Sequence, residues 1–345
     1  MSNNLAKIFS IVVSFVLVIF LILLGELYCR VFCDIPFLGN SRALFVKNAY
    51  GDSIGNAAKI EAVSFGTKVY TDINGFRVPI DFEGIRKPGR AILFLGDSVA
   101  FGPGTREEDT FVGLARKEFL TMNIYNSAVI GYDTRDYKNV MEHFIPQHEE
   151  VERIYLIFCL NDICHRSAEL IDNAIGALKQ ESGQANKMIC SLGANRFIQK
   201  INQYLRSRSK LYLALRHILT DPSALSWEAD RLLYESDNEE NFMKTMRAII
   251  YINDAAKIKK IPFTVIIAPY EFQLRDNFKG NHLPQEKLVS FFKKEGINYI
   301  NALDYFKGRG IKSKEIFLTS DPMHFSPKGH KIMHEIICED YSGQN

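Results

Sequence analysis

Apolar residues follow two patterns along the chain, one long stretch at the start and several short runs further on. Residues 8–24 are apolar except for Ser10 and Ser14. At about 1.5 Å per residue this stretch covers roughly 26 Å, close to the roughly 30 Å of hydrocarbon in a bilayer. No small-residue cleavage site follows it, which favours a retained anchor over a cleaved signal peptide. We therefore predict a short tail at 1–7 and a transmembrane signal anchor over 8–30.

Five short apolar runs beyond residue 90 predict the strands of a parallel sheet. They lack the polar alternation of a half-exposed strand, which indicates burial on both faces. The runs are Ala91–Leu95, Ile124–Tyr125, Arg153–Cys159, Phe263–Ala268 and Ile297–Ile300. Helical patterns separate them, as in a sheet that is covered by helices on both sides. The preceding segment, 31–90, is mixed and predicts short strands and turns, with a strand at Lys68–Thr71 and a turn at Asn74–Gly75.

About a hundred residues separate the third run from the fourth, which is too many for one connection. Their patterns are mostly helical, with one helix expected at Asn241–Ile258 and an apolar face formed by Leu211, Leu215 and Leu219 on another. Residues 165–240 therefore form a helical insertion at the top of the sheet. Such an insertion is either a lid or substrate wall or a structural cap, and the sequence leaves both open.

The composition is that of an ordinary globular protein. The 345 residues are 47% hydrophobic and 24% charged, which excludes a disordered chain. With 42 basic and 40 acidic residues the net charge is +2, so no nucleic-acid partner is expected. Six cysteines are too few for a disulfide framework. Lys7 before the apolar stretch and Arg30 and Arg42 after it do not favour either membrane orientation.

Residues with catalytic potential follow three of the predicted strands. Ser98 follows Gly96 and Asp97 after the first run, where a strand-to-helix turn points a serine hydroxyl out of the sheet. Gly131 follows the second run and permits close approach of a substrate to the backbone. Asn161 follows the third run, where its amide can donate to a developing oxyanion. The carboxyl ends of parallel strands meet at one edge, where α/β sheets bind ligands.

A further block near the C-terminus joins a carboxylate to a histidine. Asp321 precedes His324 by three residues, a spacing that lets the carboxylate hydrogen-bond the imidazole and orient it as a base. Ser326 and Pro327 predict the start of a helix directly after this pair. Each motif taken alone is more typical of a turn than of a catalytic device.

Taken in order, the four blocks resemble those of the SGNH hydrolases, also called GDSL esterases. The resemblance covers about residues 66–340 apart from the insertion, and its blocks are 96–105, 126–132, 159–162 and 321–324. Cys159 stands where the third block usually has glycine. Ala100 replaces the second glycine of a Gly-x-Ser-x-Gly elbow, which argues against the α/β-hydrolase fold. Residues 70–77 are similar to a segment of membrane-anchored bacterial members.

The resemblance implies a three-layer α/β/α, flavodoxin-like fold over residues 91–345 and a serine hydrolase site. Ser98 would be the nucleophile and His324 its general base, with the imidazole held in its productive tautomer by Asp321. The backbone N–H groups of Ser98 and Gly131 and the side-chain amide of Asn161 would form the oxyanion hole. A member of this family needs no metal and no cofactor.

Other polar residues near these blocks are interpreted as structural. Asp97 and Asp162 are assigned to their turns. His330 and His334 are spaced like a metal-binding pair, but no third ligand is evident, and we interpret them as ordinary helix residues. With His324 as the only candidate base, activity should fall on acidification through a pKa near 6.5, and a flat rate from about pH 4 to 8 would contradict this.

The activity that the resemblance implies is hydrolysis of an ester, an O-acyl or O-acetyl group on an extracytoplasmic glycan or lipid. The protein would be a single-pass membrane protein with its catalytic domain in the periplasm, by analogy with anchored family members. The same triad serves an O-acyltransferase that works with a membrane acyl-transfer partner. A lipase or thioesterase and a non-catalytic binding module are further alternatives. A disulfide between Cys159 and Cys164, which flank Asn161, is left open.

Overall fold

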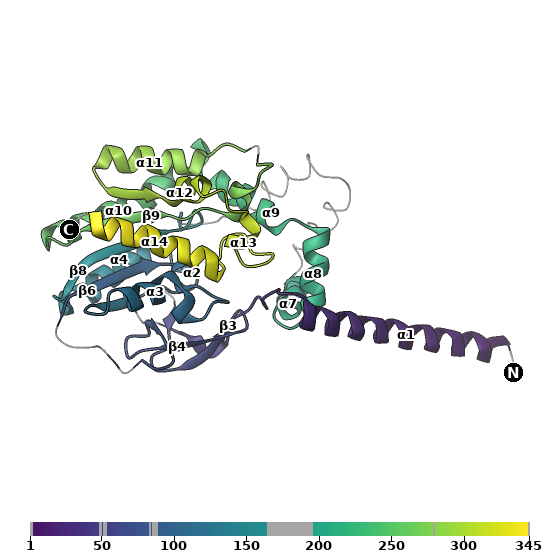
Figure 1. Ribbon diagram of the computed structural model, residues 1–345. Coiled ribbons are helices and arrows are strands. Elements are labelled where there is room, and N and C mark those ends of the chain that lie inside the picture. Colours follow the sequence, from purple (N-terminus) through teal and green to yellow (C-terminus); the bar gives the residue numbers. More distant parts are fainter. Residues whose placement is uncertain are drawn as a thin grey trace.

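The computed structural model shows one α/β domain from which a long helix, α1 (Asn3–Phe32), projects (Figure 1). The described residues are 3–47, 50, 54–82, 84, 89–163, 196–278 and 280–343. Cys164 and the first part of the predicted insertion lie outside them, so the structure does not test the open question of a Cys159–Cys164 disulfide.

The centre of the domain is a sheet of five parallel strands in the order β10-β9-β8-β6-β7. The strands are β6 (Ala91–Gly96), β7 (Asn123–Asn126), β8 (Val151–Phe158), β9 (Phe263–Ile267) and β10 (Asn298–Asn301). Each coincides with one of the five predicted runs, so the predicted parallel sheet is confirmed. The expected burial on both faces is wrong for β10, which lies at the edge of the sheet and is partly exposed. Numbered along the chain, the order is 2-1-3-4-5, the flavodoxin-like order, in which ligands bind where the strand order reverses. That point lies between β6 and β8.

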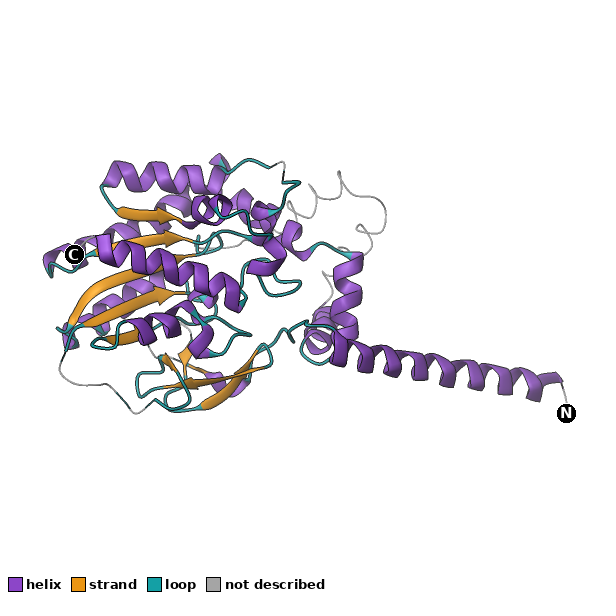
Figure 2. Cartoon of the chain, in the orientation of Figure 1, coloured by secondary structure: helices purple, strands orange, loops and turns teal. Residues whose placement is uncertain are grey.

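Helices lie on both faces of this sheet and complete the three predicted layers (Figure 2). α3 (Phe111–Glu118) packs against α14 (Pro327–Gly343), and α4 (Thr134–His143) packs against α10 (Glu239–Ile258). Because both faces are covered, every residue of β6 and β9 is buried, which explains their unbroken apolar sequences. The domain also contains α2 (Ser98–Phe101), α11 (Leu283–Glu295), α12 (Ala302–Gly308) and α13 (Ser313–Ile316).

The segment before the sheet contributes two small antiparallel sheets. These are β1 (Phe45–Val46) with β2 (Gly55–Asn56), and β3 (Glu61–Ser64), β4 (Thr67–Thr71) and β5 (Arg77–Val78). The turn between β4 and β5 forms as predicted, and the Asp72 carboxylate stabilises it by accepting from the backbone N–H groups of Asn74 at 2.8 Å and Phe76 at 2.9 Å. Phe76 is buried against Phe144 and Tyr125 of the main domain. This segment therefore shares the core of the domain and covers the edge strand β7.

The described part of the predicted insertion is helical. It comprises α7 (Arg196–Arg206), α8 (Lys210–Leu219) and α9 (Pro222–Arg231), and α8 contacts α1. Single-turn 3-10 helices complete the described elements: η1 (Arg42–Leu44), η2 (Glu107–Asp109), η3 (Ile145–Gln147), η4 (Leu232–Tyr234), η5 (Ser236–Asn238) and η6 (Glu271–Leu274). Among the described helices, α1 is long and apolar enough over Leu5–Phe32 to cross a membrane. The large apolar side chains of that stretch are exposed, whereas Cys29 is buried.

Candidate active site

Ser98 lies on the turn that joins β6 to the short helix α2. Asp97 caps this helix, and its carboxylate accepts a hydrogen bond of 2.8 Å from the backbone N–H of Val99. Gly96 is required at the turn because a Cβ atom there would lie 2.6 Å from the Cβ of Ala100. The strand, the cap and the glycine together fix the Ser98 hydroxyl at the carboxyl edge of the sheet.

Three residues from the two ends of the domain form a chain of hydrogen bonds. The Nε2 atom of His324 lies 2.8 Å from Ser98 Oγ, and its Nδ1 atom lies 2.8 Å from Asp321 Oδ2. Since an ionised carboxylate only accepts, Nδ1 carries the proton and Nε2 accepts from the Ser98 hydroxyl. The loop is fixed by Asp321 Oδ1, which accepts from the backbone N–H groups of Met323 and His324. The structure therefore brings together the predicted nucleophile, base and orienting carboxylate.

The electrostatics of this group follow from burial and from the close charges. Burial by itself would lower the pKa of His324, but the charge of Asp321, its hydrogen bond and the charge of Asp97 outweigh burial and raise that pKa above its ordinary value. For Asp321 burial would raise the pKa, and the interactions with His324 outweigh it, so the pKa is lowered. The acid limb of activity is therefore expected above the value of 6.5 inferred from sequence, because the base must be neutral to accept a proton.

The two other predicted site residues lie on the loops that follow β7 and β8. Gly131 is in an exposed turn with φ of 92°, a conformation that favours glycine. Asn161 is partly buried; its Oδ1 atom has no hydrogen-bond partner among the described residues, and its Nδ2 atom lies 3.9 Å from Met323 Sδ. Neither residue hydrogen-bonds to Ser98, Asp321 or His324, so both remain available to a substrate.

Asp162, assigned to structure from sequence, stabilises the loop that carries Asn161. Its Oδ2 atom accepts from the backbone N–H of Cys159 at 2.9 Å and from the hydroxyl of Tyr137 at 3.0 Å. Burial and the nearby charge of Asp97 raise the pKa of Asp162 well above its ordinary value. The buried Cys159 side chain lies 3.9 Å from Met323 Sδ and so takes part in the packing beneath the loop.

A buried arginine fixes the loop on the other side of Ser98. Arg77, the first residue of β5, donates through Nη1 to the carbonyls of Phe101 and Gly102 and through Nη2 to the carbonyl of Thr105. Burial lowers its pKa to about 10, partly offset by the charges of nearby glutamates. Arg77 ends the segment 70–77 that is similar to anchored family members, but the sequence predicts no role for it because nothing local shows which carbonyls it meets.

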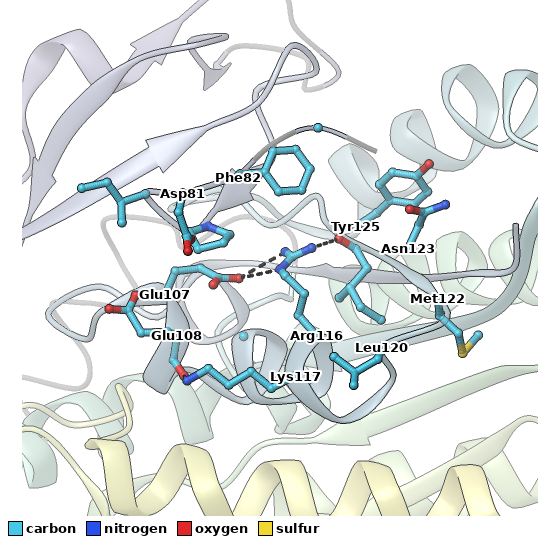
Figure 3. Close-up of a pocket in the computed structure, with 15 residues that line it drawn as sticks. Asp81, Phe82, Glu107, Glu108, Arg116, Lys117, Leu120, Met122, Asn123 and Tyr125 are labelled. Carbon is cyan, nitrogen blue, oxygen red and sulfur yellow. Dashed lines mark hydrogen bonds and ion pairs between the residues drawn. The ribbon is translucent and has the colours of Figure 1, made fainter. Parts of the chain in front are cut away.

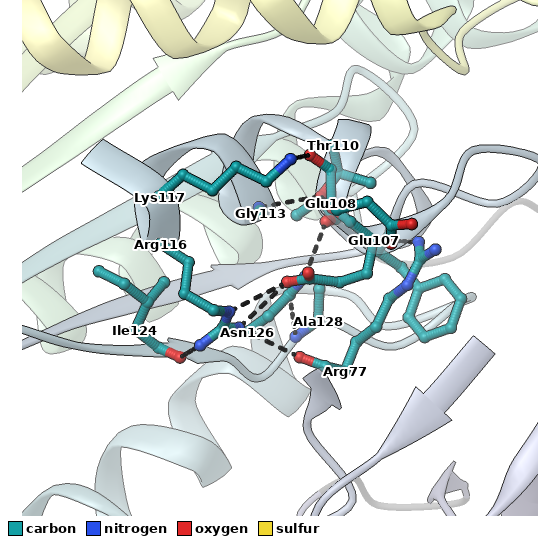
Figure 4. A network of polar contacts seen from close by, with 12 residues as sticks. Arg77, Glu107, Glu108, Thr110, Gly113, Arg116, Lys117, Ile124, Asn126 and Ala128 are labelled. Atoms are coloured by element: carbon teal, nitrogen blue, oxygen red, sulfur yellow. Dashed lines mark hydrogen bonds and ion pairs between the residues drawn. The ribbon is translucent and has the colours of Figure 1, made fainter. Parts of the chain in front are cut away.

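An ion pair and further hydrogen bonds lie beside Arg77 (Figure 4). Glu107 is buried and binds Arg116 at 3.1 Å, and Arg116 also donates to the Ile124 carbonyl of β7 at 2.6 Å. Asn126, at the end of β7, donates to the Ala100 carbonyl of α2 at 3.3 Å. These contacts tie the edge of the sheet to the loop and helix that carry Ser98.

Another buried histidine lies against the same loop. The ring of His330, on α14, is within 3.2 Å of the position that a Cβ on Gly102 would take, and its Nδ1 atom accepts from the backbone N–H of Phe111 at 3.3 Å. Burial and the positive charge of Arg77 lower the pKa of His330 to about 3, so it is neutral. Among the described residues no group of three His, Cys, Asp or Glu side chains is arranged to hold a metal.

Phe65 is a site residue that sequence analysis missed. It lies in the turn between β3 and β4, and its ring stands edge-on to His324 with the centroids 5.3 Å apart. Its φ of 49° is unfavourable for a bulky side chain. A residue that keeps such a conformation is held there by its surroundings, and no pattern in the sequence distinguishes this phenylalanine from the others.

A cavity of about 380 Å³ opens at the edge of the sheet beside β7, where Phe82 and Arg116 face it (Figure 3). Asp81, Lys117 and Tyr125 also line it. None of the residues hydrogen-bonded to Ser98 lines this cavity, so an ester does not reach the serine through it.

Together, the sheet order and the hydrogen-bonded group define an α/β/α protein with a serine, a histidine and an aspartate in triad geometry. No protein-family model matches the chain, and no curated protein matches it. Matching solved structures include a lipolytic G-D-S-L family member from Veillonella parvula, with 11% identity, 74% of this chain and 99% of that chain covered, and a TM-score of 0.41.

Two further solved structures are similar to the same extent. A catalytic mutant of an acetylxylan esterase from Geobacillus stearothermophilus is 11% identical, with 74% of this chain and 95% of that chain covered and a TM-score of 0.39. An α/β hydrolase enzyme from the metagenome of Lake Arreo is 10% identical, with 76% and 100% covered and a TM-score of 0.42. At these identities the likeness concerns the fold alone, so the chemistry of this chain is inferred from its own residues.

Proposed function

We propose that this protein is a membrane-anchored SGNH-type serine esterase. The observation that carries the proposal is the unbroken chain of 2.8 Å contacts from Asp321 through His324 to Ser98. A serine hydroxyl is a weak nucleophile unless a base accepts its proton, and here a buried, oriented imidazole lies within hydrogen-bond distance of it. The order of the four sequence blocks supports the same assignment.

In the proposed reaction Ser98 Oγ attacks the acyl carbonyl while His324 Nε2 accepts the serine proton. The positive imidazolium that forms is stabilised by the carboxylate of Asp321. The N–H groups of Ser98 and Gly131 and the Asn161 amide donate to the oxyanion, whose stabilisation is the largest single contribution in such sites. His324 then gives its proton to the leaving alcohol, and water attacks the acyl-enzyme with the same base.

The substrate class proposed is an O-acyl or O-acetyl ester on an extracytoplasmic glycan or lipid. The anchoring is supported by the way α1 ends. Its last turns are part of the folded domain, because the Glu26 carboxylate accepts hydrogen bonds from the start of α8. Cleavage of α1 as a signal peptide would remove that contact.

The experiment that tests the esterase proposal compares three forms of the full chain in detergent: wild type, Ser98→Ala and the exposed-serine control Ser236→Ala. Release of 4-nitrophenol is followed from the acetate ester and from longer acyl esters. We expect wild type and Ser236→Ala to release it at equal rates and Ser98→Ala to fall to the background. The same reactions with an added oligosaccharide distinguish hydrolysis from acyl transfer, because transfer yields an acylated sugar.

Equal rates in wild type and Ser98→Ala would remove Ser98 as the nucleophile and contradict the proposal. Ser98-dependent release that prefers acetate would support a deacetylase or acetyltransferase. A preference for long acyl chains would instead favour a lipase or thioesterase.

A further inference from the structure

The end of α1 that enters the domain is joined to the helical insertion by a partly buried carboxylate. The side chain of Glu26 is only 18% exposed. Its oxygens accept from Ser209 Oγ at 2.8 Å and from the backbone N–H groups of Lys210 at 3.1 Å and Leu211 at 3.0 Å. These N–H groups begin α8 and have no partner within a helix, so Glu26 caps α8 from a different helix.

The position of Glu26 along α1 sets the depth of this junction. No charged residue occurs between Lys7 and Glu26. At about 1.5 Å per residue, residues 8–25 cover roughly 27 Å, nearly the full hydrocarbon thickness of a bilayer. Glu26 therefore marks the boundary of the hydrocarbon, and α8 begins at that level. Figure 1 shows α8 running across the direction of α1 rather than along it, so the whole helix stays near the boundary.

One face of α8 is apolar, and its first residue contacts α1. Leu211, Leu215 and Ile218 share this face at helical spacing and are called the α8 stripe. Leu211 touches α1, since a Cβ on Gly25 would lie 3.2 Å from Leu211 Cδ2. Further along the helix, Leu215 is 48% exposed and Ile218 is 77% exposed. Beyond the contact with α1, the stripe is therefore exposed.

The opposite face of α8 is the one that packs on the domain. Leu213 is buried in a small apolar cluster with Ile35 and Leu38 of the segment that follows α1, and Phe65 packs against this cluster. Phe65 also touches the ring of His324. α8 thus buries Leu213 against the domain and places Leu211 against α1, whereas Leu215 and Ile218 at the far end of the stripe are exposed.

Basic residues flank the stripe at both ends. Arg30 and Arg208 are exposed beside the junction with α1, where Arg30 donates to the Arg208 carbonyl at 2.8 Å. At the far end, Lys312 and Lys314 are exposed and line an open groove of about 820 Å³ together with Ile218. The same groove contains Arg275, which is paired with Asp221 and Glu271. An apolar strip between basic side chains is the pattern of a helix that lies in the interface of an anionic membrane.

We propose that the α8 stripe binds the surface of the membrane that α1 spans, with the flanking arginines and lysines against anionic lipid headgroups. This rests on the membrane anchoring in the proposed function and not on the chemistry at Ser98. The domain then has two attachments, a spanning helix and an interfacial helix, which fix its orientation. Because Leu213, its neighbours Ile35 and Leu38, and Phe65 connect α8 to His324, the active site is held close to the lipid surface.

The test uses tryptophan as a depth reporter, because Trp227, the single tryptophan of the chain, is fully buried. The full chain is reconstituted into vesicles of phosphatidylcholine and phosphatidylglycerol that carry brominated acyl chains, which quench tryptophan in the hydrocarbon. Ile218→Trp and Leu215→Trp report on the stripe. His217→Trp is the matched control, since it points about 100° away from Ile218 around the helix. Val16→Trp reports insertion of α1, and the unchanged chain gives the Trp227 background.

We expect strong quenching of Val16→Trp, clear quenching of both stripe variants, and quenching of His217→Trp lower by a factor of about two or more, as for a helix half-immersed in the interface. Stripe variants quenched no more than His217→Trp, with Val16→Trp quenched, would overturn the interfacial placement and leave the anchoring intact. An unquenched Val16→Trp would remove the anchoring and the interfacial placement together. Ser98-dependent ester release would be unaffected by either result, so the two failures are distinguishable.

Discussion

His324 and His330 are both buried, and they lie at the two ends of the short helix that begins with Ser98. His324 contacts Ser98 itself at 2.8 Å, whereas His330 lies against Gly102, the residue that ends the helix. Their environments have opposite charge. His324 faces the carboxylate of Asp321, and His330 faces the guanidinium of Arg77.

The difference shows that burial does not decide the protonation of a histidine. Burial lowers the pKa of both rings, yet the net pKa of His324 is raised and that of His330 is lowered to about 3. The adjacent charge decides the direction. One histidine is thereby able to exchange a proton near neutral pH, and the other is a fixed, neutral part of the scaffold around the nucleophile.

The largest expected effect is on kcat, which should depend strongly on His324 and only weakly on His330. His324→Ala should lower kcat roughly a millionfold, and combining it with Ser98→Ala should cost nothing further, because members of a triad act as one unit. His330→Gln should retain activity within about tenfold of wild type, since its ring touches no reacting atom. Ester hydrolysis by the three variants is the measurement. A comparable loss in His330→Gln would remove the distinction between the two sites.

The next effect tests the charge that sets the pKa of His324. Asp321→Asn should lower kcat about ten-thousandfold, because the imidazole loses its orienting carboxylate. It should also shift the acid limb of the pH–rate profile to lower pH, since the largest interaction that raises the pKa of His324 is removed. The control is Asp304→Asn, at an exposed position, with an unchanged profile. An acid limb that stays in place would show that another group sets it.

At the other end of the helix, the main effect of Arg77→Met should be to lower the stability of the protein rather than to alter the catalytic residues. Three buried carbonyls lose their donor, and we expect a loss of about 3 kcal/mol in the free energy of unfolding. The measurement is urea unfolding of the full chain in detergent, followed by the fluorescence of Trp227. Arg106→Met, which removes an exposed arginine paired with Asp109 at 2.9 Å, should cost less than about 1 kcal/mol.

The pH–rate profile of Arg77→Met gives a second test of its role. The pH of the acid limb should be the same in Arg77→Met as in wild type, because Arg77 does not contact His324, while kcat falls as the loop after Ser98 loosens. Arg77→Lys should be more stable than Arg77→Met but less stable than wild type, since an ammonium can replace only some of the hydrogen bonds made by the guanidinium. A shifted acid limb in Arg77→Met would show that the charge of Arg77 contributes to the pKa of His324, contrary to this prediction.

The smallest effect concerns the pH dependence of stability at His330. Its pKa is about 3 in the folded protein and about 6.5 when unfolded. Between those values the unfolded state binds the extra proton, so this group costs stability as the pH falls below about 6.5. His330→Gln should therefore lose about 2 kcal/mol less than wild type between pH 7 and pH 5. Parallel curves for wild type and His330→Gln would contradict the assignment.

Much of the fold was predictable because its signals are local. Four of the five strands are buried almost throughout and the edge strand β10 is partly exposed, yet an apolar run marks each of them in the sequence. The contact between Ser98 and His324 was predictable only through the resemblance, because 226 positions separate the two residues. Arg77 and Phe65 were not predictable as site residues, since their importance comes from carbonyls and rings that distant segments bring to them.

The sequence by itself determined which side chains could react and which stretch could enter a membrane. Apolar periodicity and the spacing of Asp321 and His324 are properties of short segments, so they can be recognised without knowledge of the tertiary structure. Tertiary structure decided the pKa of each histidine, because the charge that faces a buried ring belongs to a different part of the chain. It also decided that α8 begins beside Glu26 of α1, because this carboxylate and the two N–H groups it caps, 184 and 185 positions away, meet only in the folded protein.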